Sequence, residues 1–537
     1  MVLGRKGILF KSLSYNRFVY LKSLYWKLKH TSGFITPESR LVPDVAEMVR
    51  NSKEKIPPHV GMLKLKPISV PAQLEKAVNR LIEKYPTNNL VESAASFARV
   101  LWGRHPPIEA HELNKKWKEV TKEVLDNTKF SSKLSEDALE KKIHHKIVHL
   151  VKTKTYNWQP ITYDAYKSFL YMVSRMPANY AVLIQCLSEI IKRDPNFKPR
   201  NVFDFGSGTG SSIWACNKIW NKAIFEYFSC DISTDMNTVN RLLLQDGEEQ
   251  KDMSINGVYL RQFIPVKSTK LYNLVICAYS LFELKSKTDR LNIIYKLWNL
   301  TEDYLIIIEN GTNAGFHLII EARNAILNKS DADSTTETNV FSPCPHNLSC
   351  PMLVEAKKIP CNFEVIYKPF HFVSKEKNFV ERYSYVILQK KPLKETNHWP
   401  RVLQSPRKHS KHIHMKLCCP NGEIQHAFIT AKKHGKEMYH CLSQSKWGDL
   451  LPVTHAPCAQ SPNNLQILDN SKATANDVPF LETDPHTPMF IYYTFTYFQN
   501  NLSIALDIFL TCSNCDESLD NDQVIPIALV TLYQMTS

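Results

Sequence analysis

A short apolar run that ends in a glycine-rich turn, at residues 202–210, restricts the fold of this chain more than any other feature. Gly206, Gly208 and Gly210 follow the apolar residues 202–205 and precede a segment with helical spacing. Because glycine has no Cβ, the backbone can turn sharply here and a ligand can lie against it. The free N–H groups at the start of the next helix favour a polar or anionic ligand. The pattern predicts the first strand, turn and helix of a nucleotide-binding α/β domain.

The spacing of the glycines separates two classes of ligand site. Nicotinamide and flavin sites favour G-x-G-x-x-G, whereas Asp204 begins a D-x-G-x-G-x-G pattern in this chain. That pattern resembles the first motif of class I methyltransferases, which bind S-adenosylmethionine. An acidic residue about 20 positions further on takes ribose hydroxyls in such sites, and Asp231 ends the next expected strand. We therefore expect an S-adenosylmethionine site made by Asp204, Gly206, Gly208, Gly210 and Asp231.

Residues 196–391 alternate strand patterns with helical patterns, at the spacing of a mostly parallel, doubly wound sheet. The elements expected after the first strand are, in chain order, 211–220, 226–230, 272–277, 291–300, 304–308 and 316–327. Two more strands, at 363–372 and 382–390, are close enough in sequence to pair antiparallel at the edge of the sheet. The predicted fold class is α/β, with a class I methyltransferase Rossmann-like domain.

The sequence before this domain divides into three expected parts. Residues 1–37 contain seven basic side chains and no acidic one, which resembles a mitochondrial transit peptide; a basic disordered arm is the alternative. Residues 38–71 are punctuated by prolines and are expected to form an extended arm. Apolar positions three and four apart predict a helical lobe at 72–195. One of its helices is expected to begin near Ser174, with Pro177 tolerated in the first turn.

The charge of the chain is unevenly distributed. Lysine and arginine number 67 against 52 aspartate and glutamate, yet residues 461–537 contain nine acidic residues and one lysine. The remainder is therefore strongly basic, which favours a polyanionic partner such as RNA or an anionic membrane surface; a solvated basic surface is the alternative. No uninterrupted run of about 20 apolar residues occurs, so stable membrane insertion is not expected. No role follows for the acidic tail at 461–537.

No recognisable catalytic group for methyl transfer accompanies the glycine turn. Enzymes that methylate a base nitrogen resemble one another in an Asn/Asp-Pro-Pro-Tyr loop after the fourth strand, where this chain has the unrelated residues 277–283. Methylation of a base carbon needs a nucleophilic cysteine, but Cys277 lies within an apolar strand and is interpreted as a core residue. Tyr279 or Glu283 could line a pocket, although neither has an identifiable partner for proton transfer. The catalytic residues remain unassigned, and the sequence leaves open whether the chain is an enzyme.

Cysteines gather in an insertion at residues 329–362 and again further along the chain. Cys344, Cys350 and Cys361 lie beside prolines in the insertion, and Cys418 and Cys419 are adjacent. Four thiolates match an all-cysteine site for zinc or for an iron-sulfur cluster, and the spacing does not choose between them. His346 could replace one thiol. The insertion is therefore predicted to bind a metal.

Residues 392–460 are expected to form a small, basic, β-rich module. The basic and aromatic side chains that suggest a nucleic-acid surface are Arg407, Lys408, His409, Lys411, His412, His414, Lys416, Lys432, Lys433, His434, Lys436, Tyr439 and Trp447. Cations that contact phosphates, together with aromatic faces that stack on bases, are typical of RNA-binding β modules. RNA is the predicted ligand, with a solvated basic face as the alternative.

Several motifs occur together in residues 72–453: S-R-M-P-A-N-Y at 174–180, D-F-G-S-G-T-G at 204–210, E-N-G-T-N-A-G-F at 309–316, C-P-H at 344–346, C-P at 350–351, L-C-C-P at 417–420 and W-G-D-L-L at 447–451. This combination resembles the Rsm-type mitochondrial small-subunit methyltransferase-like family. The resemblance implies a matrix factor that binds the maturing small mitoribosomal subunit, contacts its rRNA and supports mitochondrial translation. It also implies a four-iron, four-sulfur cluster on Cys344, Cys350, Cys361 and one of the adjacent pair, taken here as Cys418.

Three functional hypotheses follow from these features. The leading one is an assembly factor that uses a methyltransferase fold, S-adenosylmethionine and an iron-sulfur cluster to dock on small-subunit rRNA. The second is an active rRNA methyltransferase whose catalytic residues are unfamiliar. The third is a redox or iron sensor, in which assembly activity follows cluster loading.

Overall fold

The computed structural model describes residues 34–52, 58–63, 65–127, 136–265, 270–332, 337–355, 359–392, 398–454, 492–495 and 506–509. Residues 1–33 of the expected transit peptide at 1–37, and most of the acidic tail, lie outside the described residues. The chain divides into two units, residues 1–459 and 460–537. In the second unit, β15 (Tyr492–Phe495) and β16 (Leu506–Phe509) pair antiparallel. No helix in the described part of the chain is long and apolar enough to cross a membrane.

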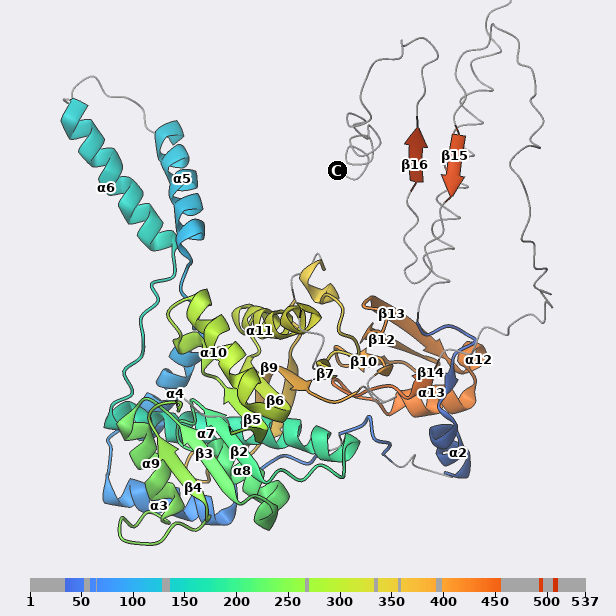
Figure 1. Ribbon diagram of the computed structural model, residues 1–537, viewed down its shortest axis with the longest axis horizontal. Coiled ribbons are helices and arrows are strands. Elements are labelled where there is room, and N and C mark those ends of the chain that lie inside the picture. The colour runs from blue at the N-terminus through green and yellow to red at the C-terminus, as the bar shows by residue number, and fades with distance from the viewer. Residues whose placement is uncertain are drawn as a thin grey trace, which may run out of the picture. The chain divides into compact units, whose positions relative to one another are not determined.

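A mostly parallel sheet of eight strands forms the centre of the first unit (Figure 1). Its parallel strands are β2 (Asn201–Phe205), β3 (Glu226–Cys230), β4 (Val258–Arg261), β5 (Tyr272–Ala278) and β6 (Thr301–Asn310). The strand order is β4-β3-β2-β5-β6-β9-β7. From β2 the chain first adds strands on one side, as far as β4, and then continues on the other side with β5. The gap between β2 and β5 is therefore the switch point where ligands bind in α/β sheets. The predicted α/β class, a doubly wound methyltransferase-like sheet, is confirmed.

Antiparallel strands complete one side of the sheet. β9 (Phe379–Gln389) pairs antiparallel with β6, and β8 (Phe363–Tyr367) pairs antiparallel with β9, as the sequence predicted for these two segments. β7 (Asn339–Ser342) also pairs with β9, and no strand was expected there. Because this strand is only four residues long, it has no extended apolar pattern from which it could be predicted.

Helices cover both faces of the sheet, and side chains that alternate along each strand enter two different cores. Leu274 and Ile276 of β5 pack with one set of helices, α7 (Ala165–Arg193), α8 (Ser211–Trp220) and α9 (Thr234–Leu244). Val275 and Cys277 pack on the opposite face with α10 (Lys287–Leu300) and α11 (Asn313–Ala332). Burial on both faces explains why these strands have continuous apolar sequences.

The expected helical lobe contains α3 (Ala72–Lys84), α4 (Leu90–Trp102), α5 (Ala110–Asn127) and α6 (Glu136–Lys154) before α7. The prediction that a helix begins near Ser174 is wrong, because α7 runs without interruption from Ala165 and contains Pro177 in its interior. Nearly all side chains around Pro177 are buried. Packing therefore maintains the helix where the proline removes one hydrogen bond.

The segment expected to be an extended arm instead contains α2 (Pro43–Asn51), with its proline in the first turn. Just before it, β1 (Arg40–Leu41) pairs antiparallel with β14 (Val453–Thr454). Val45 and Val49, one helical turn apart, enter the core of the C-terminal module. Residues separated by some 400 positions in sequence thus fold into one small core. No local sequence pattern predicts that contact.

The C-terminal module is built on a four-stranded antiparallel sheet. Its strands are β10 (Arg401–Val402), β11 (Arg407–Lys408), β12 (His412–Cys418) and β13 (Ile424–Thr430). The short β segments expected here are present, but two helices, α12 (Ala431–His434) and α13 (Lys436–Ser443), follow them. Four of the predicted basic residues therefore lie on helices: Lys432, Lys433, His434 and Lys436.

Candidate functional site

The glycine turn lies at the carboxyl end of β2 and has the backbone conformation that glycine permits. Gly206 and Gly210 have φ angles of +67° and +84°. A Cβ at Gly206 would lie 2.0 Å from Ser280 Oγ, and one at Gly210 would lie 2.2 Å from Asn240 Oδ1. Both positions thus require glycine for conformation and for space.

Asp231 directly follows β3 and faces the turn. Its Oδ2 accepts a hydrogen bond from the Gly208 N–H at 2.8 Å, and its Oδ1 accepts one from the Ser233 N–H at 2.9 Å. Burial raises the pKa of Asp231, although these two N–H groups oppose the change. The structure therefore brings the carboxylate and the glycines together at the switch point, as the sequence predicted.

Asp204 lies on β2 and contacts the helix that follows the turn. Its carboxylate is buried and accepts a hydrogen bond from the Ser212 hydroxyl in the first turn of α8, so it ties the strand to the helix. Burial raises the pKa of Asp204 from its ordinary 3.8 to about 7. The hydrogen bond from Ser212 lowers this pKa, whereas the negative charge of Asp231 raises it further. Asp204 therefore supports the turn from behind.

Several buried polar atoms beside the turn lack a hydrogen-bond partner among the described residues. They are Ser207 Oγ, Thr209 Oγ1 and both side-chain polar atoms of Asn240. An unsatisfied buried polar group costs about 1–3 kcal/mol, so a polar ligand at this position would stabilise the fold. The residues present thus fit a nucleoside-containing ligand such as S-adenosylmethionine.

A segment that precedes α7 lies against the loop after β5. Trp158 Nε1 donates a hydrogen bond to the Phe282 carbonyl at 2.9 Å, and Tyr163 OH donates one to Glu283 Oε1 at 3.2 Å. Arg104 Nη2 pairs with Glu283 Oε2 at 2.9 Å. Burial raises the pKa of Glu283, with Arg104 opposing it. The sequence analysis identified no partner for Glu283, and the structure shows that Arg104 and Tyr163 hold its carboxylate.

Tyr279 follows β5 with a left-handed φ of +58°, a strained conformation for a residue with a Cβ. The Arg175 guanidinium lies 5.2 Å from the centre of its ring and pairs with Glu381 at 2.8 Å. Burial raises the pKa of Tyr279 well above its usual range. Sequence reasoning missed this network, although Arg175 belongs to the S-R-M-P-A-N-Y motif. Cys277 is fully buried in the core, as predicted.

The four predicted cysteine ligands converge from separate loops and one strand. Cys350 precedes a 3₁₀ turn at Pro351–Leu353, Cys361 precedes β8, and Cys418 ends β12. Burial raises the pKa of Cys418 well above its usual range, and the charges of Cys344, Cys361 and Cys350 add to this. Burial and then Cys344 likewise raise the pKa of Cys350 to about 12. The four thiols therefore form one electrostatically coupled group.

The adjacent cysteines of the L-C-C-P motif, Cys418 and Cys419, have different surroundings. Cys418 packs in a small apolar cluster with Cys350, and its Sγ lies 3.4 Å from His346 Nε2. Cys419 lies in the core of the C-terminal module, where its thiol donates to Gln425 Oε1 at 3.8 Å. The chain therefore groups Cys418, and not Cys419, with the other three thiols.

The spacing of the thiols can be compared with that of a zinc site. In the described part of the chain, the one group of three or more His, Cys, Asp or Glu ligand atoms within 4.8 Å of one another contains only histidines. A tetrahedral zinc ion with bonds of about 2.3 Å holds its sulfur ligands about 3.8 Å apart. No three of the four thiols lie within 4.8 Å of one another, and this spacing does not choose between zinc and a cluster.

Arg323 supports the loop between the first two cysteines and was missed by sequence reasoning. It is only 1% exposed, and its Nη2 donates to the carbonyls of His346 at 2.9 Å and Leu348 at 2.8 Å. An arginine within an apolar helix gives no sequence signal of such a role. The loop is therefore held by a residue of α11, distant in sequence from Cys418.

Comparison with known proteins identifies the family. A family model described as "Mitochondrial small ribosomal subunit Rsm22" matches residues 165–452. The human protein "Ribosome assembly protein METTL17, mitochondrial" is 36% identical over 446 residues, which cover 80% of this chain and 95% of the human one. The chain belongs to the Rsm22 family. The family predicted from the sequence motifs is thus confirmed.

More distant similarities are also found among curated proteins and solved structures. The Saccharomyces cerevisiae "Ribosome assembly protein RSM22, mitochondrial" is 25% identical over 410 residues, covering 51% of this chain and 65% of the yeast protein. Among solved structures, the magnesium protoporphyrin IX methyltransferase of Synechocystis with bound SAM is 12% identical, with a TM-score of 0.26 over 49% of this chain and 100% of that one.

The basic surface of this Rsm22-family chain is smaller than its sequence suggested. Lys416 is buried and pairs with Glu355, and His434 is also buried. The remaining cations are exposed, and several form no ion pair with any other described residue: Arg407, Lys411, Lys432, Lys433 and Lys436. Trp447 is half-buried beneath the Arg382 guanidinium, 5.8 Å from its ring centre. The exposed cations lie on the β11–β12 turn and on α12 and α13.

The raised pKa of Asp204 predicts a pH-dependent stability. Between about pH 4 and about pH 7 the unfolded chain releases a proton that folded Asp204 retains, so this group makes the fold less stable as pH rises. Asp204→Asn removes that loss. We therefore expect the difference in unfolding free energy between Asp204→Asn and the native chain to shift in favour of the variant by up to about 4 kcal/mol as pH rises across this range. Denaturant titrations at several pH values measure this, with exposed Asp252→Asn as the control, and parallel curves for Asp204→Asn would contradict the expectation.

Proposed function

We propose that this Rsm22-family chain is an assembly factor of the mitochondrial small ribosomal subunit, which binds the rRNA of that subunit in the mitochondrial matrix and supports mitochondrial translation. The human and yeast relatives are both named mitochondrial ribosome assembly proteins. The similarity to the human relative extends over 95% of its length, which supports a shared role of the whole chain.

The observation that carries this proposal is the contrast between the glycine turn and the loop after β5. The turn keeps the conformation and the unpartnered polar atoms suited to a nucleoside ligand. At the neighbouring loop, Glu283 is held by Arg104 and Tyr163, and residues 277–283 do not match the Asn/Asp-Pro-Pro-Tyr loop of enzymes that methylate a base nitrogen. We infer a scaffold that retains a ligand site and lacks catalytic machinery.

S-adenosylmethionine would be held by the chain's own groups at the switch point. Gly206, Gly208 and Gly210 leave room for the ligand against the backbone, and Asp231 offers carboxylate oxygens to ribose hydroxyls. When bound, S-adenosylmethionine supplies an activated methyl group. The ligand is proposed to stabilise the carboxyl end of β2, where it would satisfy the buried polar atoms of Ser207, Thr209 and Asn240.

A four-iron, four-sulfur cluster would be held by Cys344, Cys350, Cys361 and Cys418. The first three belong to loops of the sheet domain, and Cys418 belongs to β12 of the C-terminal module. When bound, such a cluster supplies metal–thiolate bonds and can change its charge by one electron. The bonds would fasten the module to the sheet domain, so cluster loading would set the orientation of the basic surface.

The rRNA is proposed to contact the exposed cations of the module. Lys432, Lys433 and Lys436 lie on α12 and α13 without ionic partners among the described residues, so they are available to neutralise phosphates. Phe428 is 44% exposed on β13 and offers a face for stacking.

Asp231→Asn tests the division between scaffold and enzyme. The amide keeps the size of the side chain and weakens the interaction with ribose hydroxyls, so we expect loss of S-adenosylmethionine binding by calorimetry. In cells that lack the native protein, we expect this variant to restore small-subunit assembly with unchanged rRNA methylation. The control is Asp252→Asn, which changes an exposed acid elsewhere.

The second candidate is an active rRNA methyltransferase, which the intact glycine turn favours. It predicts that Asp231→Asn abolishes one defined methyl mark on the rRNA and that the purified native protein restores the mark in vitro. That result would refute the scaffold proposal. Melting curves of the variant separate either outcome from simple unfolding.

A further inference from the structure

Three histidines gather at the turn between β11 and β12. The His409 N–H donates to the His412 carbonyl at 2.9 Å, which closes a two-residue turn. Beyond it, Lys408 pairs with Ile413 and Arg407 with His414 across the hairpin. Because strand residues two apart face the same side, His414 lies on the face of His412, and the turn directs His409 to the same place.

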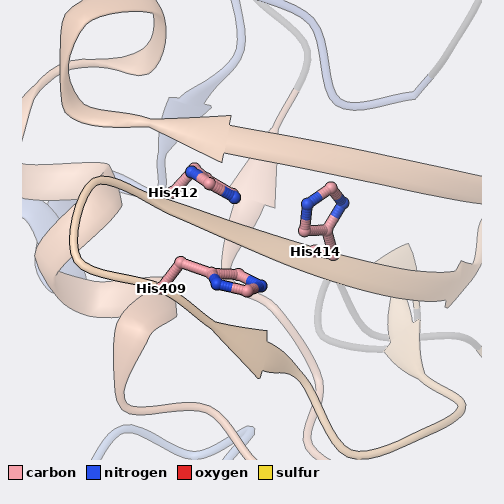
Figure 2. A group of neighbouring side chains, drawn as sticks. All are labelled: His409, His412 and His414. Carbon is pink, nitrogen blue, oxygen red and sulfur yellow. The ribbon is translucent and has the colours of Figure 1, made fainter.

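The three imidazoles face one another (Figure 2). Each offers a ring nitrogen, and these three nitrogens all lie within 4.8 Å of one another. The rings of His409 and His412 are stacked with centroids 4.6 Å apart, while His414 lies edge-on at 5.1 Å from His412 and 5.8 Å from His409. None of the three side chains makes a hydrogen bond with another described residue. Their nitrogens are therefore available to a ligand.

Neighbouring elements hold this arrangement in place. Phe428 of β13 lies opposite His414, and its ring centre is 5.0 Å from that of His414 and 4.9 Å from that of His412. The Tyr439 hydroxyl of α13 makes long hydrogen bonds to the carbonyls of His409 and Ser410, at 3.5 Å and 3.4 Å. The turn is thus packed from two sides, and the imidazoles are pre-arranged before any ligand arrives.

We propose that His409, His412 and His414 form a binding site for Zn²⁺, with a fourth coordination position open to solvent. Three imidazole nitrogens suit zinc and its transition-metal neighbours, whereas Ca²⁺ and Mg²⁺ require oxygen ligands. Three protein ligands with one open position are a known zinc geometry. With zinc–nitrogen bonds of about 2.0–2.1 Å the donor nitrogens lie about 3.4 Å apart, so the rings of His409 and His412 must rotate out of their stacked arrangement to complete the site.

The charges around the hairpin shape the properties of this site. Arg407, Lys408 and Lys411 lie on the same turn, and the described residues provide no carboxylate within the group. The bound ion therefore keeps its double charge in basic surroundings, which lowers its affinity and favours an anionic oxygen as the fourth ligand. Asp and Glu are absent from residues 398–422, so a carboxylate near the turn in sequence does not offset this.

The site is separate from the cysteine group. Cys418 lies on the same strand as His414, four residues further along, at a separation of about 13 Å for an extended strand. The two sites also differ in chemistry, since one offers only nitrogen and the other mainly sulfur. A metal probe can therefore distinguish them by spectrum.

The test uses Co²⁺ titrated into the full-length protein under anaerobic conditions. Cobalt on nitrogen ligands gives weak visible bands, whereas cobalt on thiolates adds strong near-ultraviolet charge-transfer bands. We expect one nitrogen-bound Co²⁺ per chain that Zn²⁺ displaces. In His412→Gln and in His414→Gln, we expect the affinity for Co²⁺ to fall by at least about 10- to 100-fold. That is the loss seen when a metal ligand loses only its hydrogen-bond partner, and these substitutions remove the ligand itself.

The matched control is His426→Gln, which changes an exposed histidine of β13 outside the group. It is expected to leave the nitrogen-bound cobalt unchanged, and melting curves in chelator are expected to coincide for all variants. Binding that shows only thiolate bands, that survives both substitutions, or that never occurs would overturn the proposal. Since no readout involves ribosome assembly, the result is independent of the proposed function.

Discussion

Cys350→Ser is expected to remove nearly all of the iron and the sulfur-to-iron charge-transfer absorbance from protein purified without oxygen. Cys350 is 6% exposed and packs with Cys418 in the apolar cluster at the junction of the sheet domain and the module. A serine hydroxyl is a poor ligand for iron compared with a thiolate, and a buried site gives no replacement ligand from solvent. Iron and sulfide assays with absorbance spectra measure the loss.

Cys419→Ser is the matched control for this experiment. Its thiol is also buried and adjacent in sequence to a proposed ligand, yet it lies in the core of the module beside Gln425. We expect this variant to keep its iron and its absorbance. Retention of the cluster in Cys350→Ser, or loss only in Cys419→Ser, would refute the proposed ligand set, and a colourless native protein with stoichiometric zinc would refute the cluster.

Mild oxidation of the native protein, compared with Cys350→Ser, separates a structural cluster from a regulatory one. If metal–thiolate bonds orient the module, Cys350→Ser should weaken cosedimentation with the small subunit along with cluster loss. A sensor in which assembly follows cluster loading predicts the same loss for the native protein after mild oxidation. Full rRNA binding by Cys350→Ser would count against both roles.

Glu189→Gln is expected to cost about 3–5 kcal/mol of folding free energy, because it leaves two buried guanidinium groups without a counter-charge. Glu189 Oε1 accepts hydrogen bonds from Arg401 at 2.6 Å and from Arg193 at 2.8 Å. All three side chains are at most 5% exposed. Arg401 belongs to β10 of the module, and Glu189 belongs to α7 of the sheet domain. The substitution should therefore also loosen the module.

The pH dependence of this interaction has a definite sign. Burial alone would raise the pKa of Glu189, but Arg401 and Arg193 outweigh it and lower that pKa to about 2. The stabilisation is therefore present above the pKa of the unfolded chain and is lost as pH falls toward about 2. In acid, the native chain and Glu189→Gln should converge in stability.

Denaturant titration measures both effects. The control is Glu249→Gln, which breaks an ion pair with Lys84 of 2.7 Å in which both side chains are largely exposed. Solvent screens such a pair, so its loss should cost far less stability than the loss of the buried Glu189 carboxylate. Equal losses for the two variants would contradict the role assigned to Glu189.

Local signals in the sequence predicted much of the sheet domain. The strands around Val202, Tyr227 and Leu274 have apolar side chains on both faces because helices cover both sides of the sheet. The glycines at 206, 208 and 210 are needed for left-handed backbone and for contact with Ser280 and Asn240. Each of these requirements concerns a few consecutive residues, so it leaves a readable pattern.

Other features depend on residues distant in sequence and left no such pattern. Pro177 lies within α7 because tertiary packing outweighs a lost hydrogen bond. Arg104 and Tyr163 reach Glu283 from the N-terminal helical region. The choice of Cys418 over its neighbour depends on which face of β12 meets the loops of the sheet domain.

The sequence by itself determined the α/β class, the position of the glycine turn, the cysteines available for a metal and the family. Tertiary structure decided which of these groups meet: the thiols at one junction, the three histidines at one turn, and the paired Glu283 beside the ligand site. The physical reason is that backbone conformation and burial periodicity are set by neighbouring residues, whereas a metal site or a buried ion pair requires side chains from distant segments to meet.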